Sequence, residues 1–394
     1  MSVAEAPDTT GDAPATAPIP SQRALFDLPR DVAYLNCAYM SPLMTHVVEI
    51  GRAAVARKAR PWEIRPVDFF TGPDEVRGLF ARLVGADADG VAVVPSASYG
   101  LATAAANLAL GPGRRILLVE DQFPSNVHCW RVRAATTGAT IETVACGADG
   151  DLTTALLAAI DASTAVVACA HCRWTDGALI DLEAVGVAAR AVGAALVLDL
   201  TQSAGALPID VGRVRPDFLV AASYKWLLGP YATGFLYVAP EHRDGRPLEE
   251  GWMGRAGAED FARLVDYRDG YRPGARRFDM GEAPNFALLP MAAAALEQLL
   301  AWGVPRIQAT LAARTASIAV RAAPLGLTAS DPALRAGHFL GLAFPGPVPA
   351  DLPERLAAAN VHVSLRGRSL RVTPHLWNDD EDVDRLIAAL AAAL

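Results

Sequence analysis

Short apolar runs alternate along this chain with stretches in which apolar residues recur at helical spacing. Continuous apolar runs rich in branched residues are typical of strands that are buried on both faces of a sheet. Such runs open the segment 91–110, fill 115–120 and 165–170, end at Asp199, and occur twice within 217–238. Helical spacing is found in 44–60, 153–160, 182–191 and 289–302. This alternation predicts an α/β fold with a doubly wound, mostly parallel sheet.

Two segments depart from this pattern. Residues 1–20 are mostly Ala, Pro, Thr and Asp with no apolar period, so burial cannot offset the entropy lost on ordering, and we expect a disordered tail. Residues 251–276 are polar, irregular and rich in Gly and Arg. A long segment of this kind is typical of an active-site loop.

Composition narrows the class of protein. The chain has 394 residues, of which 52% are hydrophobic and 20% charged, which fits a globular enzyme of two domains. A net charge of −8 without a basic run argues against nucleic acid as a partner. No apolar run is long enough to span a bilayer and the N-terminus has no secretion signal, so we expect a cytoplasmic protein without a membrane partner.

The five cysteines are scattered, and we expect them to be reduced thiols. Cys169 and Cys172 form a CxxC pair with His171 between them. No second pair or histidine cluster follows at the spacing of zinc ligands, so we expect no metal.

Lysine is almost absent from the chain. Of 35 Lys and Arg residues only Lys58 and Lys225 are lysines. Lys225 lies at the junction of the two apolar runs in 217–238. Arginine keeps its proton, whereas a lysine amine among apolar neighbours has a lowered pKa and becomes a nucleophile that can form a Schiff base. The alternative is a lysine at a strand end that merely extends its charge to solvent.

A carboxylate completes the pattern. The buried run in AALVLDLTQSAGALPI stops at Asp199, and the carboxyl ends of strands are where open α/β sheets place ligands. Pyridoxal phosphate requires a lysine for its aldehyde and a carboxylate that faces its ring nitrogen. Lys225 and Asp199 fit these two roles.

The segments DLTQSAGALPIDV and SYKWLLGPYATG resemble the class V aminotransferase family of fold-type I pyridoxal phosphate enzymes, which includes cysteine desulfurases, kynureninase and isopenicillin epimerase. The order of motifs extends from about Tyr34 to the C-terminus. The resemblance implies a three-layer αβα large domain over 21–280 and a small α+β domain over 281–394. An N-terminal arm, 21–45, is expected to pack toward the small domain. It also implies a homodimer with composite active sites, because 251–286 resembles the part that crosses to the partner.

The resemblance also assigns cofactor contacts. The turn and helix start at 96–100 present free N–H groups to an anion, which suits a phosphate. The residues implied to contact the cofactor are Ala97 and Ser98 at the phosphate, Tyr224 at the phosphate, Phe123 on the ring face and Gln202 at the phenolic oxygen. In FDMGEAPNF, Glu282 replaces the usual threonine, so Asn285 is the alternative contact to the phosphate of the neighbouring subunit.

On the substrate side, Arg371 matches the arginine that binds the substrate α-carboxylate, with Arg366 and Arg368 as rivals of which one should face solvent. Guanidinium suits a bidentate contact with a carboxylate. Asn36 is a candidate substrate-binding residue of the arm. Arg173 stands near the place where relatives carry asparagine or histidine, and no role is assigned to it.

The expected activity is chemistry at the α-amino group of an amino acid, with Lys225 as general base. We rank an aminotransferase first, a lyase of kynureninase or desulfurase type second and an epimerase third. A persulfide-forming desulfurase needs a cysteine shortly before the carboxylate-binding arginine, whereas the last cysteine here is Cys172. Cys37 is the only cysteine expected near the substrate, without a neighbouring cation.

Overall fold

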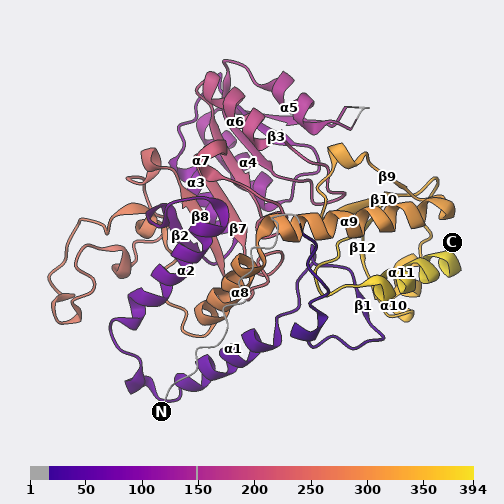
Figure 1. The fold of residues 1–394 in the computed structure, drawn as a ribbon. Coiled ribbons are helices and arrows are strands. Elements are labelled where there is room, and N and C mark those ends of the chain that lie inside the picture. The colour runs from indigo at the N-terminus through magenta and orange to yellow at the C-terminus, as the bar shows by residue number, and fades with distance from the viewer. Residues whose placement is uncertain (1–16, 148–149) are drawn as a thin grey trace, which may run out of the picture.

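The computed structural model describes residues 17–147 and 150–394 (Figure 1). Its centre is a seven-stranded sheet in the order β2-β8-β7-β6-β5-β3-β4. Only β8 runs antiparallel to its neighbours, and the other pairs are parallel. The strands are β2 (Val91–Val94), β3 (Arg115–Val119), β4 (Thr140–Val144), β5 (Thr164–Ala170), β6 (Ala195–Asp199), β7 (Phe218–Ala222) and β8 (Gly234–Val238). The predicted α/β fold with a mostly parallel sheet is confirmed.

Helices cover both faces of this sheet because successive strand residues point to opposite sides. Val91 and Val93 belong to one apolar cluster, whereas Ala92 and Val94 belong to the other. The second cluster includes α3 (Ala97–Asn107) and α4 (Ser125–Thr137). The first cluster includes α1 (Thr45–Arg57), α2 (Asp68–Val84), α5 (Leu152–Ala159), α6 (Leu182–Ala191), α7 (Val211–Val214) and α8 (Leu288–Trp302). The result is the predicted three-layer αβα arrangement.

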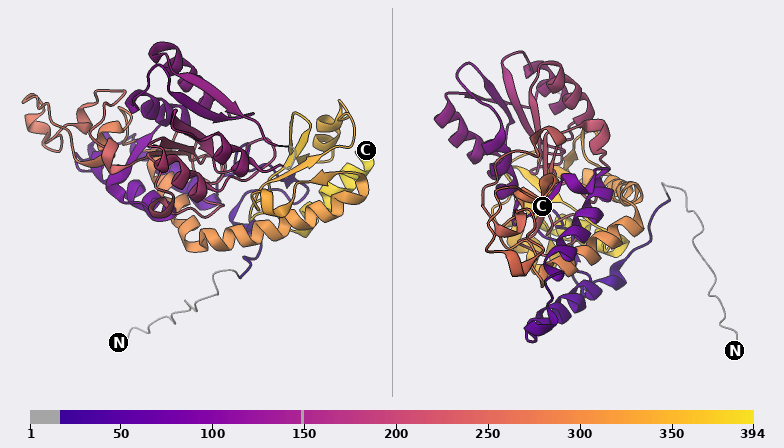
Figure 2. Two further views of the ribbon diagram at one scale, coloured as in Figure 1. Left: turned by 90° about the horizontal axis from the view of Figure 1, so that it is seen from above. Right: turned by 90° about the vertical axis from the view of Figure 1, so that its left-hand side faces the viewer.

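A second body follows toward the C-terminus and has its own apolar cluster. A four-stranded sheet has the order β12-β13-β10-β9. The long helix α9 extends into this body from the first (Figure 2). The elements are α9 (Val304–Ala322), β9 (Thr328–Ala329), β10 (Leu340–Ala343), α10 (Leu352–Ala358), β11 (Val361–His362), β12 (Ser364–Arg366), β13 (Ser369–Val372) and α11 (Asp380–Ala393).

The N-terminal segment joins the second body. Strand β1 (Ala33–Tyr34) pairs in parallel with β11. The apolar residues of α8 lie in the cluster beneath the large sheet, so a domain boundary near residue 280 stays a prediction. Residues 1–16 of the expected tail lie outside the described residues. The disorder expected for 1–20 does not extend to residue 19, because Ile19 is buried and its main-chain N–H donates to Thr310 Oγ1 at 2.9 Å.

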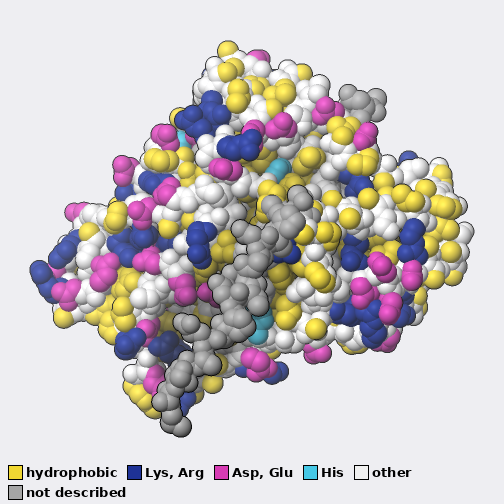
Figure 3. Space-filling model, viewed as in Figure 1, with side chains coloured by type: hydrophobic (Ala, Val, Ile, Leu, Met, Phe, Trp, Pro, Cys, Tyr) yellow, Lys and Arg dark blue, Asp and Glu magenta, His cyan; other side chains and the backbone are white. Residues whose placement is uncertain are grey.

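The surface carries charges of both signs. On the face shown in Figure 3, basic and acidic side chains are interspersed. Charged side chains of the described residues also form ion pairs, such as Arg30–Asp379 and Arg321–Asp384, in which the closest nitrogen and oxygen are 2.7 Å apart. Within the described ranges no single helix has the length and apolarity to cross a membrane, and α8 with the helical stretch after it pass that test only as a pair bent by 76°.

Candidate active site

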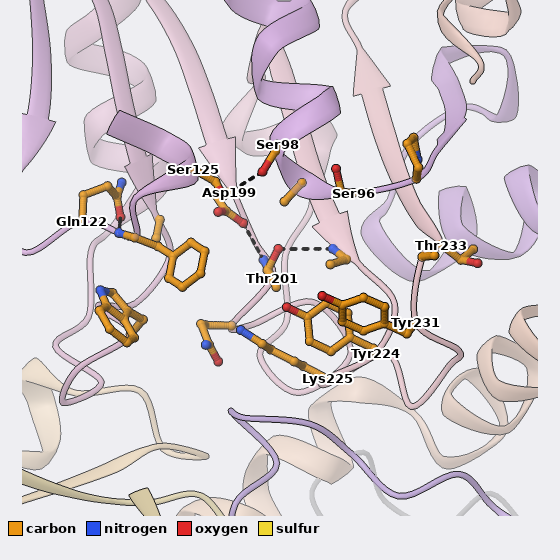
Figure 4. Close-up of a pocket in the computed structure, with 18 of the residues that line it drawn as sticks. Ser96, Ser98, Gln122, Ser125, Asp199, Thr201, Tyr224, Lys225, Tyr231 and Thr233 are labelled. Carbon is orange, nitrogen blue, oxygen red and sulfur yellow. Dashed lines mark hydrogen bonds between the residues drawn. The ribbon is translucent and has the colours of Figure 1, made fainter. Parts of the chain in front are cut away.

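A cavity of about 340 Å³ opens at the carboxyl edge of the large sheet (Figure 4). It lies where β5, β6 and β7 end and where α3 and α4 begin. The residues that line it are Pro95, Ser96, Ala97, Ser98, Gln122, Phe123, Ser125, Ala170, Cys172, Trp174, Asp199, Thr201, Gln202, Ala222, Tyr224, Lys225, Tyr231, Ala232 and Thr233. Of the residues predicted to bind the cofactor, all except Asn285 are in this set.

Lys225 follows β7 on a tight loop that returns the chain to β8. The loop includes two non-glycine residues with left-handed backbone, Leu228 at φ 54° and Ala232 at φ 60°, and strain of this kind gathers at functional sites. The lysine is only 6% exposed. Its Nζ lies 5.4 Å from the ring centroids of both Phe123 and Tyr224. Burial disfavours the charged amine and lowers the pKa of Lys225 to about 8, although the Asp199 charge opposes this shift.

Asp199 ends β6, the strand next to β7, so the sheet brings its carboxylate to the same edge as Lys225. The main-chain N–H of Thr201 donates to Asp199 Oδ1 at 3.0 Å and orients the carboxylate. Burial raises the pKa of Asp199, whereas the contacts with Thr201 and the Lys225 charge lower it. A cationic partner placed in the cavity would therefore stabilise the ionised form.

The start of α3 forms the anion-binding part of the cavity. Ser96 caps the helix, because its Oγ accepts a hydrogen bond from the N–H of Tyr99 at 3.2 Å. The first N–H groups of a helix have no partner within the helix, and the dipole favours negative charge there. Ser98 Oγ donates to Ser125 Oγ at 2.8 Å, which joins the starts of α3 and α4. Two helix N-termini thus face the same space.

The cavity wall contains two buried polar atoms that make no hydrogen bond to the described residues. Gln122 Nε2 and Thr233 Oγ1 have no hydrogen-bond partner among the residues that the structure describes. Buried polar groups are nearly always paired, so unpaired ones in a cavity wall indicate a polar ligand. Together with an amine, a carboxylate and an anion site, they fit pyridoxal phosphate. Its phosphate suits the helix starts and its ring nitrogen suits Asp199.

Gln202 is held firmly at the cavity wall. Its amide N–H donates to the Ala38 main-chain oxygen at 3.2 Å, and its amide oxygen accepts from Trp226 Nε1 at 3.1 Å. The second amide hydrogen is the donor that could serve a phenolic oxygen. Tyr224 packs on Tyr231 with ring centroids 4.5 Å apart. The individual cofactor contacts of Gln202 and Tyr224 stay predictions.

Three predicted residues lie outside the cavity lining. Asn285 caps α8, because its Oδ1 accepts from the N–H groups of Ala287 and Leu288. Asn36 Oδ1 accepts from Ser364 Oγ at 2.9 Å. Arg371 is 1% exposed. Their roles as phosphate and substrate contacts stay predictions.

Arg371 lies behind Trp174 and donates from Nη1 to the main-chain oxygen of Trp174 at 3.1 Å. Burial lowers the pKa of Arg371 to about 9. Its Nε has no partner among the described residues, which leaves a donor for an anion. Of the two rivals, Arg368 is exposed in a turn and Arg366 is half-buried.

The cysteines are poor nucleophiles here. Cys37 is completely buried with its Sγ 3.8 Å from the Lys225 main-chain oxygen, and burial raises its pKa well above the usual value. The expectation that no cation stands near Cys37 is wrong, because the Lys225 and Arg371 charges lower its pKa, but burial outweighs both. Cys172 is buried too, and its Sγ lies 3.5 Å from the Gln202 main-chain oxygen. In the described parts of the chain no group of three or more His, Cys, Asp or Glu is arranged to hold a metal ion.

Sequence reasoning missed several wall residues. Thr201 had a signal, because it stands two residues after Asp199 in the DLTQ segment. Trp174 was placed only on a loop, whereas its ring makes an edge contact with Phe123 at 5.4 Å between centroids. Nothing in the sequence singled out Gln122 and Thr233, because what marks them is a buried polar atom without a hydrogen-bond partner, and only the structure shows that.

Known proteins share the sequence pattern. The profile of the family described as Aminotransferase class-V matches residues 60–385. An uncharacterized aminotransferase of Bacillus subtilis, YcbU, is 31% identical over 319 residues, which cover 80% of this chain and 82% of the relative. A kynureninase of Deinococcus radiodurans is 33% identical over 295 residues, 70% and 68% of the two chains. The isopenicillin N epimerase of Streptomyces clavuligerus is 26% identical over 332 residues, 81% and 83% of the two chains.

Solved structures share the fold. C-DES with glycine covalently linked to its PLP cofactor aligns with a TM-score of 0.85 at 19% identity, over 95% of this chain and all 100% of that one. A cysteine desulfurase from Thermococcus onnurineus aligns with a TM-score of 0.81 at 20% identity, over 96% and 99% of the two chains. At these identities the likeness concerns the fold, and it confirms the predicted fold-type I architecture.

Proposed function

This chain belongs to the class V aminotransferase family and is a pyridoxal phosphate-dependent enzyme, and on that premise we propose that it is an aminotransferase acting on an α-amino acid. The observation that carries chemistry at the α-amino group is Lys225, the amine in the cavity wall, with its pKa lowered to about 8 and Asp199 at the next strand end. An amine with a pKa near the working pH suits both covalent attachment and proton transfer.

The residues that would hold the cofactor are those of the cavity wall. The N–H groups at Ala97 and Ser98 would bind the phosphate, Asp199 would hold a proton on the ring nitrogen, and Phe123 would cover the ring. When bound, the cofactor supplies an electron sink conjugated to the substrate Cα. Thr201 keeps the Asp199 carboxylate oriented through its N–H.

Lys225 would move the proton. Its neutral amine removes the proton from the substrate Cα, and the apolar faces of Phe123 and Tyr224 exclude water around it. The guanidinium of Arg371 would orient the substrate through its α-carboxylate, so that the Cα–H bond faces Lys225. In transamination the same amine would then deliver the proton to the cofactor carbon that is bonded to the amino nitrogen, and not back to Cα.

Transamination is favoured over epimerisation by the set of bases in the cavity. Inversion at Cα needs a second base on the other face of the substrate. The further titratable wall residues are Cys172, Tyr224, Tyr231 and Asp199. Burial raises the pKa of Cys172 and of Tyr224, which makes both poor bases at neutral pH. Asp199 would be hydrogen-bonded to the cofactor ring nitrogen and so would not act on the substrate Cα. Among the residues of the cavity wall Lys225 is thus the base best suited to move a proton, and the remaining titratable group is Tyr231, which is 63% exposed.

A β-lyase of kynureninase type is the second candidate, because the kynureninase relative shares 33% identity over 70% of this chain. Such a reaction uses the same Cα proton removal by Lys225 and differs in the bond that breaks next. The two activities give different products, so one assay separates them.

The test incubates the holo-protein with single amino acids, with and without a keto-acid acceptor, and separates the products by chiral chromatography. The proposal expects continued turnover only when the acceptor is present, with keto acid from the donor and a new amino acid in one-to-one ratio. Without the acceptor it expects at most one equivalent of keto acid per active site. Release of a side-chain fragment without acceptor would identify a lyase, and the enantiomer of the donor would identify an epimerase. Lys58→Ala should match the wild type.

We also propose a homodimer. Apolar side chains stand exposed on 251–276, where Val265 is 74% and Tyr267 is 92% exposed, and near the start of α2, where Trp62 is 76% exposed. The segment 251–276 projects from the body at the left of Figure 1. Exposed apolar surface of this kind suits contact with a second subunit. Analytical ultracentrifugation should give a dimer, and an active monomer at assay concentration would refute it. The cytoplasmic location stays a prediction.

A further inference from the structure

Two arginines contact the same residue of the cavity wall. Arg371 donates to the main-chain oxygen of Trp174 at 3.1 Å. The guanidinium carbon of Arg366 lies 5.7 Å from the centroid of the Trp174 ring, a cation–π contact. Trp174 lines the cavity and touches Phe123 with its edge. Both guanidinium groups therefore stand beside the space where a substrate would lie.

Strand register explains why they stand together. In the β12–β13 hairpin Ser364 pairs with Arg371, and Arg366 pairs with Ser369. Residues two apart on a strand share a face, so Arg366 and Arg371 are diagonal neighbours on one face. Diagonal positions are about 7–8 Å apart at the backbone, within reach of long side chains. Arg368 lies in the turn after Gly367 and is exposed.

Neither of these two arginines forms an ion pair with a carboxylate in the described parts of the chain. Arg173, the residue before Trp174, does form an ion pair, because its guanidinium lies 2.5 Å from the Asp176 carboxylate. The Arg366 charge contributes to the lowered pKa of Arg371 and of Lys225, which shows that the positive charges act on one another. Uncompensated like charges in a partly buried wall are costly unless an anion joins them.

We propose that the substrate is a dicarboxylic amino acid or its keto acid, with Arg371 binding the α-carboxylate and Arg366 binding a second acidic group at the end of the side chain. The inference rests on the proposed function for the presence of an amino-acid substrate. The Trp174 ring holds the Arg366 guanidinium in place, and a planar guanidinium fixed in this way loses little freedom on binding a carboxylate. Arg366 is thus a specificity-determining residue.

Binding without turnover tests this directly. Glutarate and valerate have the same chain length, but only glutarate has two carboxylates, and neither has an amino group that could react. Isothermal calorimetry on the holo-protein should show glutarate binding about 10-fold or more tightly than valerate, the size expected for one charge-assisted contact. Arg366→Gln should abolish this preference. Arg368→Gln, an exposed arginine of the same hairpin, is the matched control and should keep it.

Equal binding of the two acids by the wild type, or a preference that persists in Arg366→Gln, would overturn the inference. Unchanged circular dichroism and cofactor absorbance exclude misfolding of the variant. The outcome is separable from the proposed function. A glutarate preference in a protein that forms no keto acid refutes only the aminotransferase, whereas keto-acid formation without a glutarate preference refutes only the dicarboxylic substrate.

Discussion

Asp199 and Lys225 face one cavity from the ends of two neighbouring parallel strands. Asp199 pairs with Val220 in the register of β6 and β7, and Lys225 follows a few residues later on the loop beyond β7. Each group acts on the pKa of the other, since the Lys225 charge lowers the pKa of Asp199 and the Asp199 charge raises the pKa of Lys225. This coupling sets the chemistry of the site.

Asp199→Asn should reduce turnover by about 10²–10³-fold, the usual cost of removing one preorganised electrostatic contact to developing charge. Asparagine keeps the side-chain volume and an oxygen for the Thr201 N–H, so the fold and cofactor binding should persist. The measurement is kcat with the best amino-acid donor. Asp181→Asn, which alters an exposed helix cap on α6, should leave kcat unchanged. Wild-type turnover by Asp199→Asn would contradict the assigned role.

The charge of Lys225 should destabilise the apoprotein at neutral pH. Its folded-state pKa is about 8 and its usual value is 10.5, so the folded state binds fewer protons than the unfolded state between these pH values. The penalty is full below pH 8, falls as the pH rises, and vanishes above 10.5. Replacing Lys225 by Met should therefore raise the unfolding free energy of the apoprotein. The increase should be about 3 kcal/mol larger at pH 7 than at pH 10.5.

Urea unfolding of the two apoproteins at both pH values measures this difference. The matched control is Lys58→Met, which changes an exposed lysine and should give the same small effect at both pH values. A Lys225→Met effect that is equal at pH 7 and pH 10.5 would mean that the lysine is not desolvated.

A buried ion pair should hold segment 279–286 against the sheet. Arg77 is 1% exposed, pairs with Asp279 and donates to the Val91 main-chain oxygen at 2.7 Å. Asp279 also accepts from the Val93 N–H at 2.8 Å. Arg77→Met leaves the Asp279 carboxylate, which is only 11% exposed, without its cation, which should cost about 3–5 kcal/mol of unfolding free energy.

Chemical denaturation of Arg77→Met and of a surface control measures that cost. Arg52→Met removes the exposed pair with Glu49 and should change stability by about 0.5 kcal/mol or less. Equal effects of the two substitutions would show that the Arg77 pair contributes no more than a surface pair.

Cys37 should be dispensable for chemistry. Its thiol is buried, its pKa is raised, and it does not line the cavity. Cys37→Ala should keep turnover within about threefold, the range of a modest packing change that does not touch the reacting atoms. Mass spectrometry after incubation with cysteine should find no protein persulfide. A persulfide that forms and turns over on any cysteine would identify a desulfurase.

The parts of the site that follow from local sequence were predicted, and those that depend on tertiary packing were not. Lys225 and Asp199 each end a buried apolar run, which the sequence displays directly. The position of Arg366 depends on the β12–β13 register and on the turn at Gly367. Strand alternation alone does not predict this register or the place of the turn. The burial of Cys37 arises because the N-terminal segment crosses behind the lysine loop.

Six of the seven strands of the large sheet and several helices were also predicted, because their apolar runs and helical periods are clear. Helix α2 was not, since Gly72 and Pro73 interrupt its pattern, yet Pro73 is accommodated inside the helix as a buried residue. Helix α9 was missed because its apolar residues share the segment with several arginines. Packing against the core, which sequence alone does not show, stabilises both helices.

The most direct test of this account is the covalent attachment of the cofactor at Lys225. The purified holo-protein should be yellow, and borohydride should bleach its visible absorbance and fix the cofactor to one peptide. Mass spectrometry of the digest should assign that peptide to Lys225, and Lys225→Ala should give no labelled peptide while Lys58→Ala labels as the wild type does. A label on Lys58, or a colourless protein that pyridoxal phosphate cannot reconstitute, would contradict the account.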